Sequence, residues 1–336
     1  MFWQHYDVAS KHAPVSAAPP LALALQGGGA HGAFTRGVLD RLLQETDVLP
    51  SAIAGASAGA VNAVLTAWGL LQGGRSGARD ALRQFWTEVG RKSLLSPLGL
   101  PGGALNFDLW TRLFSPYQFN PLNFNPLRDL LGGIVDFEAL RRSRDIALFI
   151  SATDVASGEP RIFRETELTL DMLMASTCLP NISQAVEIDG RSYWDGGLSA
   201  NPPILPLALE TKCRTLLVVK LTPDQEPNLP TAAADIVSRL RRILFNGSLQ
   251  RDLVALTEMR ALLHRSTLSS GDLRRIRDLV VRQISIDHDF FSGQDGSMLS
   301  PRPDLLEKLF AAGVAAVAAM IGAPVTTPIQ ANAGED

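Results

Sequence analysis

Strand-length apolar runs alternate with segments of helical periodicity along most of this chain. Leu21–Leu25 is an unbroken apolar run, and the segment after it places Phe34, Val38 and Leu42 on one helical face. Further strands are expected at 51–56, 146–153, 160–163, 186–188, 191–194, 215–221 and 279–286, and helices at 61–71, 80–93, 169–176, 234–265 and 310–321. This order predicts an α/β fold in which a mostly parallel sheet has helices on both faces.

Turn and linker signals frame these elements as one folded unit with two tails. Asp189-Gly190 predicts a two-residue hairpin, and the glycines of residues 72–79 predict a loop. Residues 94–127 are rich in Pro, Gly, Asn and aromatic side chains and predict a long packed connection, with a lid or wall of a site as the functional alternative. The expected boundaries are a flexible leader at 1–20, a folded domain at 21–323 and a disordered tail at 324–336.

A serine between two glycines follows the second predicted strand, in Gly55-Ala56-Ser57-Ala58-Gly59. A sharp strand-to-helix turn exposes and fixes a serine hydroxyl, and its strained backbone accepts only small neighbours, here Gly55 and Gly59. The turn also places Ser57 at a helix N-terminus, where the helix dipole favours developing negative charge. The spacing predicts a nucleophilic serine, although a serine N-cap on a buried helix would explain the motif taken alone.

A glycine run follows the first predicted strand, in Gln26-Gly27-Gly28-Gly29-Ala30-His31-Gly32. The N–H groups of consecutive glycines can point into one concavity that holds a phosphate or an oxyanion. Gly27, Gly29 and Gly32 also match the Gly-x-Gly-x-x-Gly dinucleotide fingerprint, so a nucleotide- or phosphate-binding module is one alternative. That fingerprint expects an acidic residue at the end of the second strand, where this chain has Ser57.

A third motif, Asp195-Gly196-Gly197, follows the predicted hairpin. Its two glycines let the chain turn at once and let another backbone approach the Asp195 carboxylate. Asp-Gly-Gly by itself is most often only a turn, so this motif gains meaning only beside the other two.

The three motifs, in this order, resemble those of the patatin-like phospholipases, a family of lipid acyl hydrolases. Ala175-Ser176 and Leu179-Pro180 are also similar to the family, and the resemblance spans residues 21–203. It implies a three-layer α/β/α patatin-like fold and a carboxylic ester hydrolase, with 94–127 as a lid or acyl-chain wall. His31 departs from the family, which usually has Arg or Lys there; we expect His31 to pack or cap locally.

The resemblance implies a catalytic dyad that needs no histidine. Ser57 would attack the ester carbonyl of a lipid, and Asp195 would accept and return the proton. The oxyanion hole would consist of Gly27, Gly28, Gly29 and Ala58, with Gly32, Gly55, Gly59, Gly196 and Gly197 as motif support. No metal ion and no cofactor is implied.

A serine–histidine–aspartate triad is the alternative mechanism. Of the five histidines, only His288 follows a predicted strand and comes after both Ser57 and Asp195, which is the chain order of α/β-hydrolases. Against the triad, Ser57 follows the second predicted strand rather than one deep in the sheet, and a glycine loop precedes Ser57 in the chain. Otherwise His288 is expected in a surface loop among aspartates.

Composition limits the partners of this 336-residue chain. Its formal net charge of −3 gives no bias towards nucleic acid, and the arginine clusters at 141–144, 239–242 and 274–277 predict solvated helix faces, with contact to anionic lipid as the alternative. Cys178 and Cys213 predict buried, reduced thiols. The N-terminus does not resemble a secretory signal, and the apolar run at 310–321 is too short to span a bilayer. We therefore expect a cytoplasmic protein that acts on lipid or acyl esters, with peripheral membrane contact, while the oligomeric state stays open.

Overall fold

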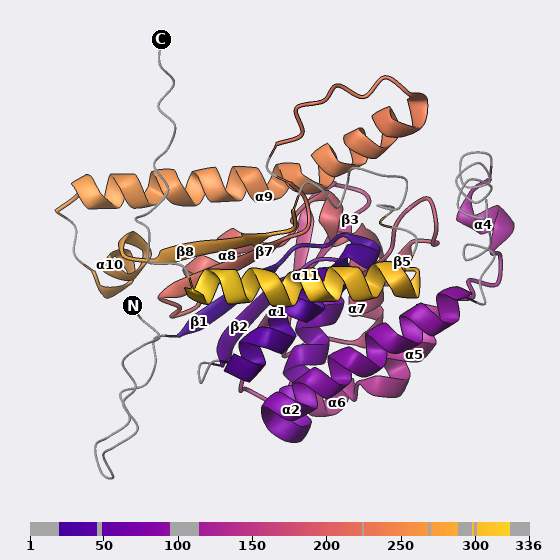
Figure 1. Cartoon of the computed structure of the whole chain (residues 1–336), viewed down its shortest axis with the longest axis horizontal. Helices are drawn as coiled ribbons and strands as arrows, with labels where there is room; N and C mark the ends of the chain where they lie inside the picture. Colours follow the sequence, from indigo (N-terminus) through magenta and orange to yellow (C-terminus); the bar gives the residue numbers. More distant parts are fainter. Residues whose placement is uncertain are drawn as a thin grey trace.

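The computed structural model describes residues 20–45, 49–94, 114–223, 225–267, 270–287, 298 and 301–322. Its strands are β1 (Leu21–Leu25), β2 (Pro50–Gly55), β3 (Ala147–Asp154), β4 (Pro160–Arg164), β5 (Val186–Ile188), β6 (Arg191–Asp195), β7 (Thr215–Lys220) and β8 (Val280–Ser285). They form one sheet in the order β5-β6-β3-β2-β1-β7-β8, with β4 paired to β3 (Figure 1).

The sheet is parallel in its centre and antiparallel at one side. The neighbours β3, β2, β1, β7 and β8 pair in parallel, whereas β4 and β6 pair with β3 in antiparallel fashion, and β5 pairs with β6. The turn between β5 and β6 is the predicted hairpin, with φ of 51° at Asp189 and 73° at Gly190, as a type I′ turn requires. The mostly parallel sheet predicted from the sequence is therefore confirmed.

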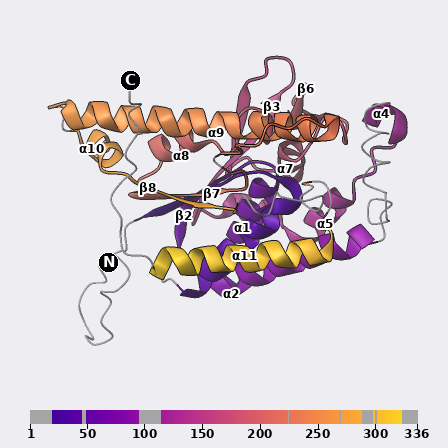
Figure 2. The same cartoon turned by 45° about the horizontal axis from the view of Figure 1, so that its top comes forward.

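Helices cover both faces of this sheet. In chain order they are α1 (Gly32–Glu45), α2 (Ala58–Leu94), α4 (Pro116–Phe119), α5 (Pro126–Ile134), α6 (Phe137–Arg142), α7 (Leu170–Ser176), α8 (Ile204–Glu210), α9 (Ala233–Arg265), α10 (Gly271–Arg277) and α11 (Pro303–Gly322), with short 3-10 turns η1 (Gly29–His31) and η3 (Gly196–Leu198). Figure 2 shows α8, α9 and α10 on one side of the strands and α1, α2 and α11 on the other.

The side chains of alternate strand residues pack into two separate hydrophobic cores, one on each face of the sheet. Leu23 and Leu25 of β1 point into the core shared with α1, α2 and α11, whereas Ala22 and Ala24 face the core shared with α8 and α9. Side chains of a strand alternate between its faces, so a strand that is buried on both sides has to be apolar throughout. This explains why β1 is an unbroken apolar run.

The helix after Ser57 is longer than the sequence predicts. The break between two helices lies within the predicted loop at 72–79 but is shorter than expected, because only Gly73 and Gly74 leave helical geometry and separate α2 into two helical arms. The two arms of α2 meet closely at this corner: a Cβ on Gly69 would lie 2.5 Å from the carbonyl oxygen of Gly77. The small residues therefore serve the packing of two helical arms rather than a loop.

Other expectations can be compared directly with the described residues. The apolar C-terminal run lies in α11, with Leu309 and Val317 buried in the core. Within the described ranges, no helix is both long and apolar enough to cross a membrane. Cys178 and Cys213 are buried and free of disulfides, as predicted. The leader up to residue 19, residues 95–113 of the aromatic connection and the tail from 323 lie outside the described residues.

Candidate active site

Strand register brings the three predicted motifs to one level of the sheet. Leu25 of β1 pairs with Gly55 of β2, and Gly55 pairs with Ile150 of β3. Two residues further along, the chain reaches Gly27 after β1 and Ser57 after β2. The same step along β3 reaches Ala152, which pairs with Asp195 of β6. The glycine loop, the serine and the aspartate therefore meet at the carboxyl ends of the parallel strands, where open α/β sheets bind their ligands.

Ser57 occupies a sharp, strained turn between β2 and α2. Its φ is +52°, in the left-handed region that a residue with a side chain seldom adopts. The turn is tight, since a Cβ on Gly55 would lie 2.5 Å from the carbonyl oxygen of Gly59. The Ser57 N–H donates a 3.0 Å hydrogen bond to Oγ of the buried Ser176 at the end of α7. Ser57 is 7% exposed and immediately precedes the first residue of α2, Ala58.

The glycine loop packs against Ser57 and is held from behind by Asn201. A Cβ on Gly27 would lie 2.8 Å from Cβ of Ser57, so only glycine fits there. The Gly27 N–H donates to Asn201 Oδ1 at 2.6 Å, and Asn201 Nδ2 donates to the Gly27 carbonyl at 3.3 Å and to the Phe245 carbonyl of α9 at 2.8 Å. Because its N–H is engaged in this way, Gly27 acts as the anchor of the loop rather than as an oxyanion donor.

Three N–H groups next to Ser57 remain as candidate oxyanion donors. Among the described residues, the N–H groups of Gly28, Gly29 and Ala58 make no backbone or side-chain hydrogen bond. Gly29 has φ of +56°, a conformation that turns the loop into η1. Donors that are already oriented before the reaction are what an oxyanion hole requires.

Asp195 is fully buried at the end of β6. Oδ1 accepts a 2.7 Å hydrogen bond from the Gly197 N–H, and Asp195 donates its own N–H to the Cys178 carbonyl at 2.7 Å. Burial raises the pKa of Asp195 to about 7, against the opposing effects of the Gly197 N–H and of the Ser57 hydroxyl. Oδ2 has no hydrogen bond of standard geometry among the described residues, so the contact with Ser57 is looser than that with Gly197. Such contacts often tighten only when substrate is bound.

The segment around Asp195 is fixed by buried polar neighbours. Thr153 Oγ1 donates to the Asp195 carbonyl at 2.7 Å, and Ser151 Oγ donates to the Ala200 carbonyl at 2.8 Å. Burial, reinforced by the nearby Asp195, raises the pKa of the Cys178 thiol to about 12, so Cys178 stays a neutral thiol. The remaining motif glycines pack tightly against neighbouring elements, namely Gly32, Gly59, Gly196 and Gly197.

The alternatives to a serine–aspartate dyad receive less support from the geometry. His288, the histidine of the alternative triad, lies outside the described residues. For a phosphate-binding loop, two N–H groups are already engaged, since Gly27 donates to Asn201 and Ala30 donates to the Met298 carbonyl at 2.8 Å. His31 is 2% exposed and ends η1, so it packs locally, as predicted. The described part of the chain contains no cluster of His, Cys, Asp and Glu suited to a metal ion.

Sequence reasoning missed the two residues that position the site. In the sequence, Ser176 belongs to a stretch that resembles the family, and no motif points to Asn201. Asn201 lies six residues after Asp195 and just before Pro202 and Pro203. The sequence offers no signal that distinguishes Asn201 from other asparagines. Its role depends on burial and on hydrogen bonds to Gly27, and both arise only in the folded chain.

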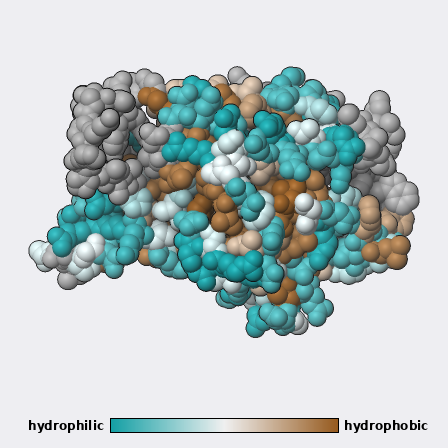
Figure 3. All heavy atoms as spheres, turned by 90° about the horizontal axis from the view of Figure 1, so that it is seen from below, coloured by the Kyte–Doolittle hydropathy of each residue, from teal (hydrophilic) through white to brown (hydrophobic). Residues whose placement is uncertain are grey.

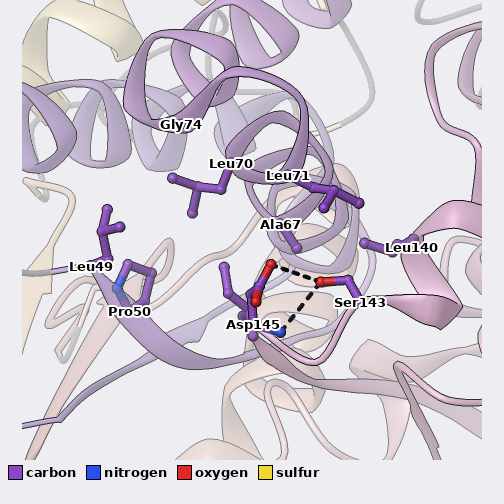
Figure 4. Close-up of a pocket in the computed structure, with 10 residues that line it drawn as sticks. Leu49, Pro50, Ala67, Leu70, Leu71, Gly74, Leu140, Ser143 and Asp145 are labelled. Atoms are coloured by element: carbon purple, nitrogen blue, oxygen red, sulfur yellow. Dashed lines mark hydrogen bonds between the residues drawn. The ribbon is translucent and has the colours of Figure 1, made fainter.

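A cavity lies at the other end of the sheet and does not include Ser57 or Asp195. Its volume is about 200 Å³, and residues at the start of β2, the corner of α2 and the end of α6 line it (Figure 4). Ala67, Leu70 and Leu71 supply the helical wall, and the polar edge contains Ser143, whose Oγ donates to Asp145 Oδ2 at 3.1 Å. Figure 3 looks at the molecule from below and shows apolar residues gathered in the middle of that face.

Comparison with known proteins agrees with the three motifs. The family model for patatin-like phospholipase matches residues 23–208. The uncharacterized protein YjjU of Escherichia coli (strain K12) is 29% identical over 244 residues, which are 71% of this chain and 62% of YjjU, so the chain spans less than two thirds of this curated relative.

Two solved structures are similar at low identity. VipD from Legionella pneumophila has a TM-score of 0.40 at 13% identity and covers 90% of this chain and 70% of its own. The ExoU-SpcU complex from the type III secretion system of Pseudomonas aeruginosa has a TM-score of 0.31 at 19% identity, with 78% and 57% covered. The family assignment rests instead on the family model, which covers more than half of the 336 residues and includes all three motifs. The chain therefore belongs to the patatin-like phospholipase family.

Proposed function

We propose that this protein is a serine lipid acyl hydrolase that cleaves carboxylic esters of lipids through a Ser57–Asp195 dyad. The observation that carries the proposal is the meeting of a strained, nearly buried serine with a buried carboxylate whose pKa is raised to about 7. A carboxyl group with this pKa can accept a proton from an alcohol and return it near neutral pH, which an ordinary aspartate does poorly.

The first half of the reaction forms an acyl-enzyme. Ser57 Oγ attacks the ester carbonyl while its proton passes to Asp195, and the negative charge develops on the carbonyl oxygen. Gly28, Gly29 and Ala58 would donate their N–H groups to that oxygen, next to the N-terminus of α2. The carbon–oxygen bond to the leaving alcohol then breaks, and Asp195 protonates the alcohol.

The second half regenerates the serine. A water molecule attacks the acyl-enzyme and gives its proton to Asp195. The bond between Ser57 Oγ and the acyl carbon breaks, Asp195 returns the proton to Ser57, and the fatty acid leaves. The reaction consumes one water molecule and uses no cofactor.

Hydrolysis of a medium-chain p-nitrophenyl ester tests the proposal. Ser57→Ala and Asp195→Asn should each lower kcat/KM by about 10³-fold or more, since both residues act on the reacting atoms. Ser51→Ala is the matched control: it lies at the opposite end of the same strand, is exposed, and should leave the rate unchanged. Circular dichroism verifies folding of each variant.

The same assay separates the mechanisms. Loss of activity in folded His288→Ala, together with the other two variants, would replace the dyad by a triad. An inactive wild-type enzyme on both soluble ester and phospholipid vesicles would contradict the hydrolase assignment, and nucleotide titration would then test the phosphate-binding alternative.

A further inference from the structure

The amino-terminal half of α9 exposes an apolar face to solvent. Ile236, Val237, Leu240, Ile243 and Leu244 are each between 38% and 58% exposed. At about 100° per residue they fall within an arc of roughly 120° on one side of the helix. We call these five residues the α9 apolar face. Five large aliphatic side chains on one exposed helical face form the kind of contiguous patch that marks an interaction site.

Arginines accompany this face and acidic residues are absent from it. Residues 236–251 contain four arginines and no Asp or Glu. Arg239 and Arg242 both bind Glu226, at 3.0 and 2.8 Å, which fixes two of these cations beside the helix. Asp235 and Asp252 flank this stretch, and with both of them and Glu226 counted the four arginines still outnumber the three carboxylates. An apolar face beside basic side chains is typical of helices that lie in the interface of an anionic bilayer.

The opposite side of the same helix touches the candidate active site. Phe245 is buried, and its ring packs so closely on Gly197 that a side chain at Gly197 would collide with it. Its carbonyl accepts the hydrogen bond from Asn201 Nδ2, and Ser248 Oγ accepts one from the Asn201 N–H at 3.0 Å. One helix therefore supports the Asp195 segment with one side and presents the α9 apolar face with the other.

A second group of exposed apolar side chains is joined to the segment before Asp195. Tyr117, Leu122 and Phe124 are 58%, 91% and 69% exposed. The Tyr117 hydroxyl accepts a hydrogen bond from the Ala185 N–H at 3.1 Å, and Gln184 Nε2 donates to the Asn120 carbonyl at 2.7 Å. Figures 1 and 2 both place α4 at the same end of the molecule as the amino-terminal part of α9.

We infer that the α9 apolar face, with Tyr117, Leu122 and Phe124 at the same end of the molecule, docks the protein onto the surface of an anionic lipid bilayer. The inference rests on the proposed function in one respect: an enzyme that cleaves membrane lipids has to bind the bilayer that contains them. The arginines favour a lipid surface over a second copy of this chain, because self-association would bring two sets of like charges together.

Vesicle co-sedimentation tests this inference without using activity. The probes are vesicles of pure phosphatidylcholine and vesicles of equal parts phosphatidylcholine and phosphatidylglycerol. Wild-type protein should bind the anionic vesicles more tightly, and added salt should weaken this binding. Replacing both Leu240 and Leu244 by Asn should lower binding about 30- to 1,000-fold, because each side chain contributes about 1–2 kcal/mol when it enters the bilayer and a tenfold change corresponds to about 1.4 kcal/mol.

The matched control lies on the other half of the same helix. Val254 and Leu262 are 55% and 67% exposed, and replacing both by Asn should leave vesicle binding unchanged. Neither double variant should change hydrolysis of a soluble ester, because none of the four residues touches the candidate site. An inactive wild type that still binds anionic vesicles through Leu240 and Leu244 would contradict the proposed function and support the docking surface.

Three results would overturn the inference. The first is wild-type protein that binds neither kind of vesicle. The second is equal loss of binding in the two double variants. The third is a wild-type dimer in size-exclusion chromatography that the Leu240 and Leu244 double variant converts to a monomer, since the α9 apolar face would then be a contact between copies of this chain.

Discussion

The two ends of the central sheet are built from the same strands but bury different chemistry. At the carboxyl ends, Gln26, Asn201 and Asp195 are completely buried, and burial lowers the pKa of Lys220 to about 8. At the amino ends, a cavity of about 200 Å³ has mainly aliphatic walls (Figure 4). Charged groups there stay near the surface, as in the 2.8 Å ion pair between Arg164 and Glu210.

This difference identifies the carboxyl ends of the strands as the place where destabilising features are concentrated. Buried polar side chains and a serine with positive φ are unfavourable unless neighbours hold them, and the carboxyl end supplies those neighbours through Ser176, Asn201 and Gly197. The amino end has no comparable set of buried polar groups among the residues lining its cavity. Substitutions at the carboxyl ends should therefore change activity as well as stability, whereas those at the amino ends should leave activity unchanged.

The sharpest contrast is expected for two carboxyl groups. Asp195→Asn should lower activity about 10³-fold and should also stabilise the protein above pH 7. The carboxyl group has a pKa near 3.8 when unfolded and about 7 when folded, so its ionisation opposes folding by up to about 4 kcal/mol. Asp145→Asn at the cavity edge should change neither property. Thermal melts at pH 5 and pH 8 measure the effect; a less stable Asp195→Asn at pH 8 would contradict it.

The sign of the pH dependence follows from the same pKa. Below about pH 4 Asp195 is protonated in both states, between pH 4 and 7 only the folded state holds the proton, and stability falls across this window. The proposed base must be ionised to act, so kcat/KM should rise about 50-fold from pH 5 to pH 7 and level off above about pH 8. Stopped assays with a soluble ester over this range measure the profile. A flat profile between pH 5 and 7 would exclude Asp195 as the titrating base.

The loop anchor should matter for rate rather than for binding. Asn201→Ala removes both hydrogen bonds to Gly27, which frees the loop that carries Gly28 and Gly29. We expect kcat to fall by about 10²-fold with little change in KM, because displaced oxyanion donors affect mainly the transition state. Asn246→Ala is the control, since Asn246 contacts Gln26 but not the Gly27 backbone. An equal loss of kcat in both variants would show that Asn201 contributes to general packing and not to the position of the glycine loop.

The smallest change in stability is expected for a substitution at the amino ends of the strands, where the cavity lies. Ala67→Met should fill part of the cavity with a flexible side chain and stabilise the protein by about 1 kcal/mol or less. Activity should stay within the error of the assay, because the cavity does not reach Ser57 or Asp195. Urea unfolding and the soluble-ester assay measure the two properties. A clear loss of activity would show that the two ends of the sheet are coupled.

Much of the fold could be predicted because local pattern and tertiary structure agree. The apolar runs of β1 and β7 and the Asp189-Gly190 turn each have one favourable structure, and the chain adopts it. The break in α2 is shorter than the sequence predicts, because Gly73 and Gly74 carry the same signal in a long loop and in a tight corner between two helices. Only the contact between Gly69 and Gly77 distinguishes the two.

The sequence by itself determined the mostly parallel sheet, the family and the three motifs of the candidate site. These depend on short-range patterns: side-chain periodicity, turn glycines and motif order. Tertiary structure alone decided that Gly27 is anchored by Asn201, that Ser176 holds the Ser57 turn and that α9 packs on the Asp195 segment with one side and exposes an apolar face on the other. These features join residues far apart in the chain, and burial and hydrogen bonding between such residues exist only once the strands have aligned in register.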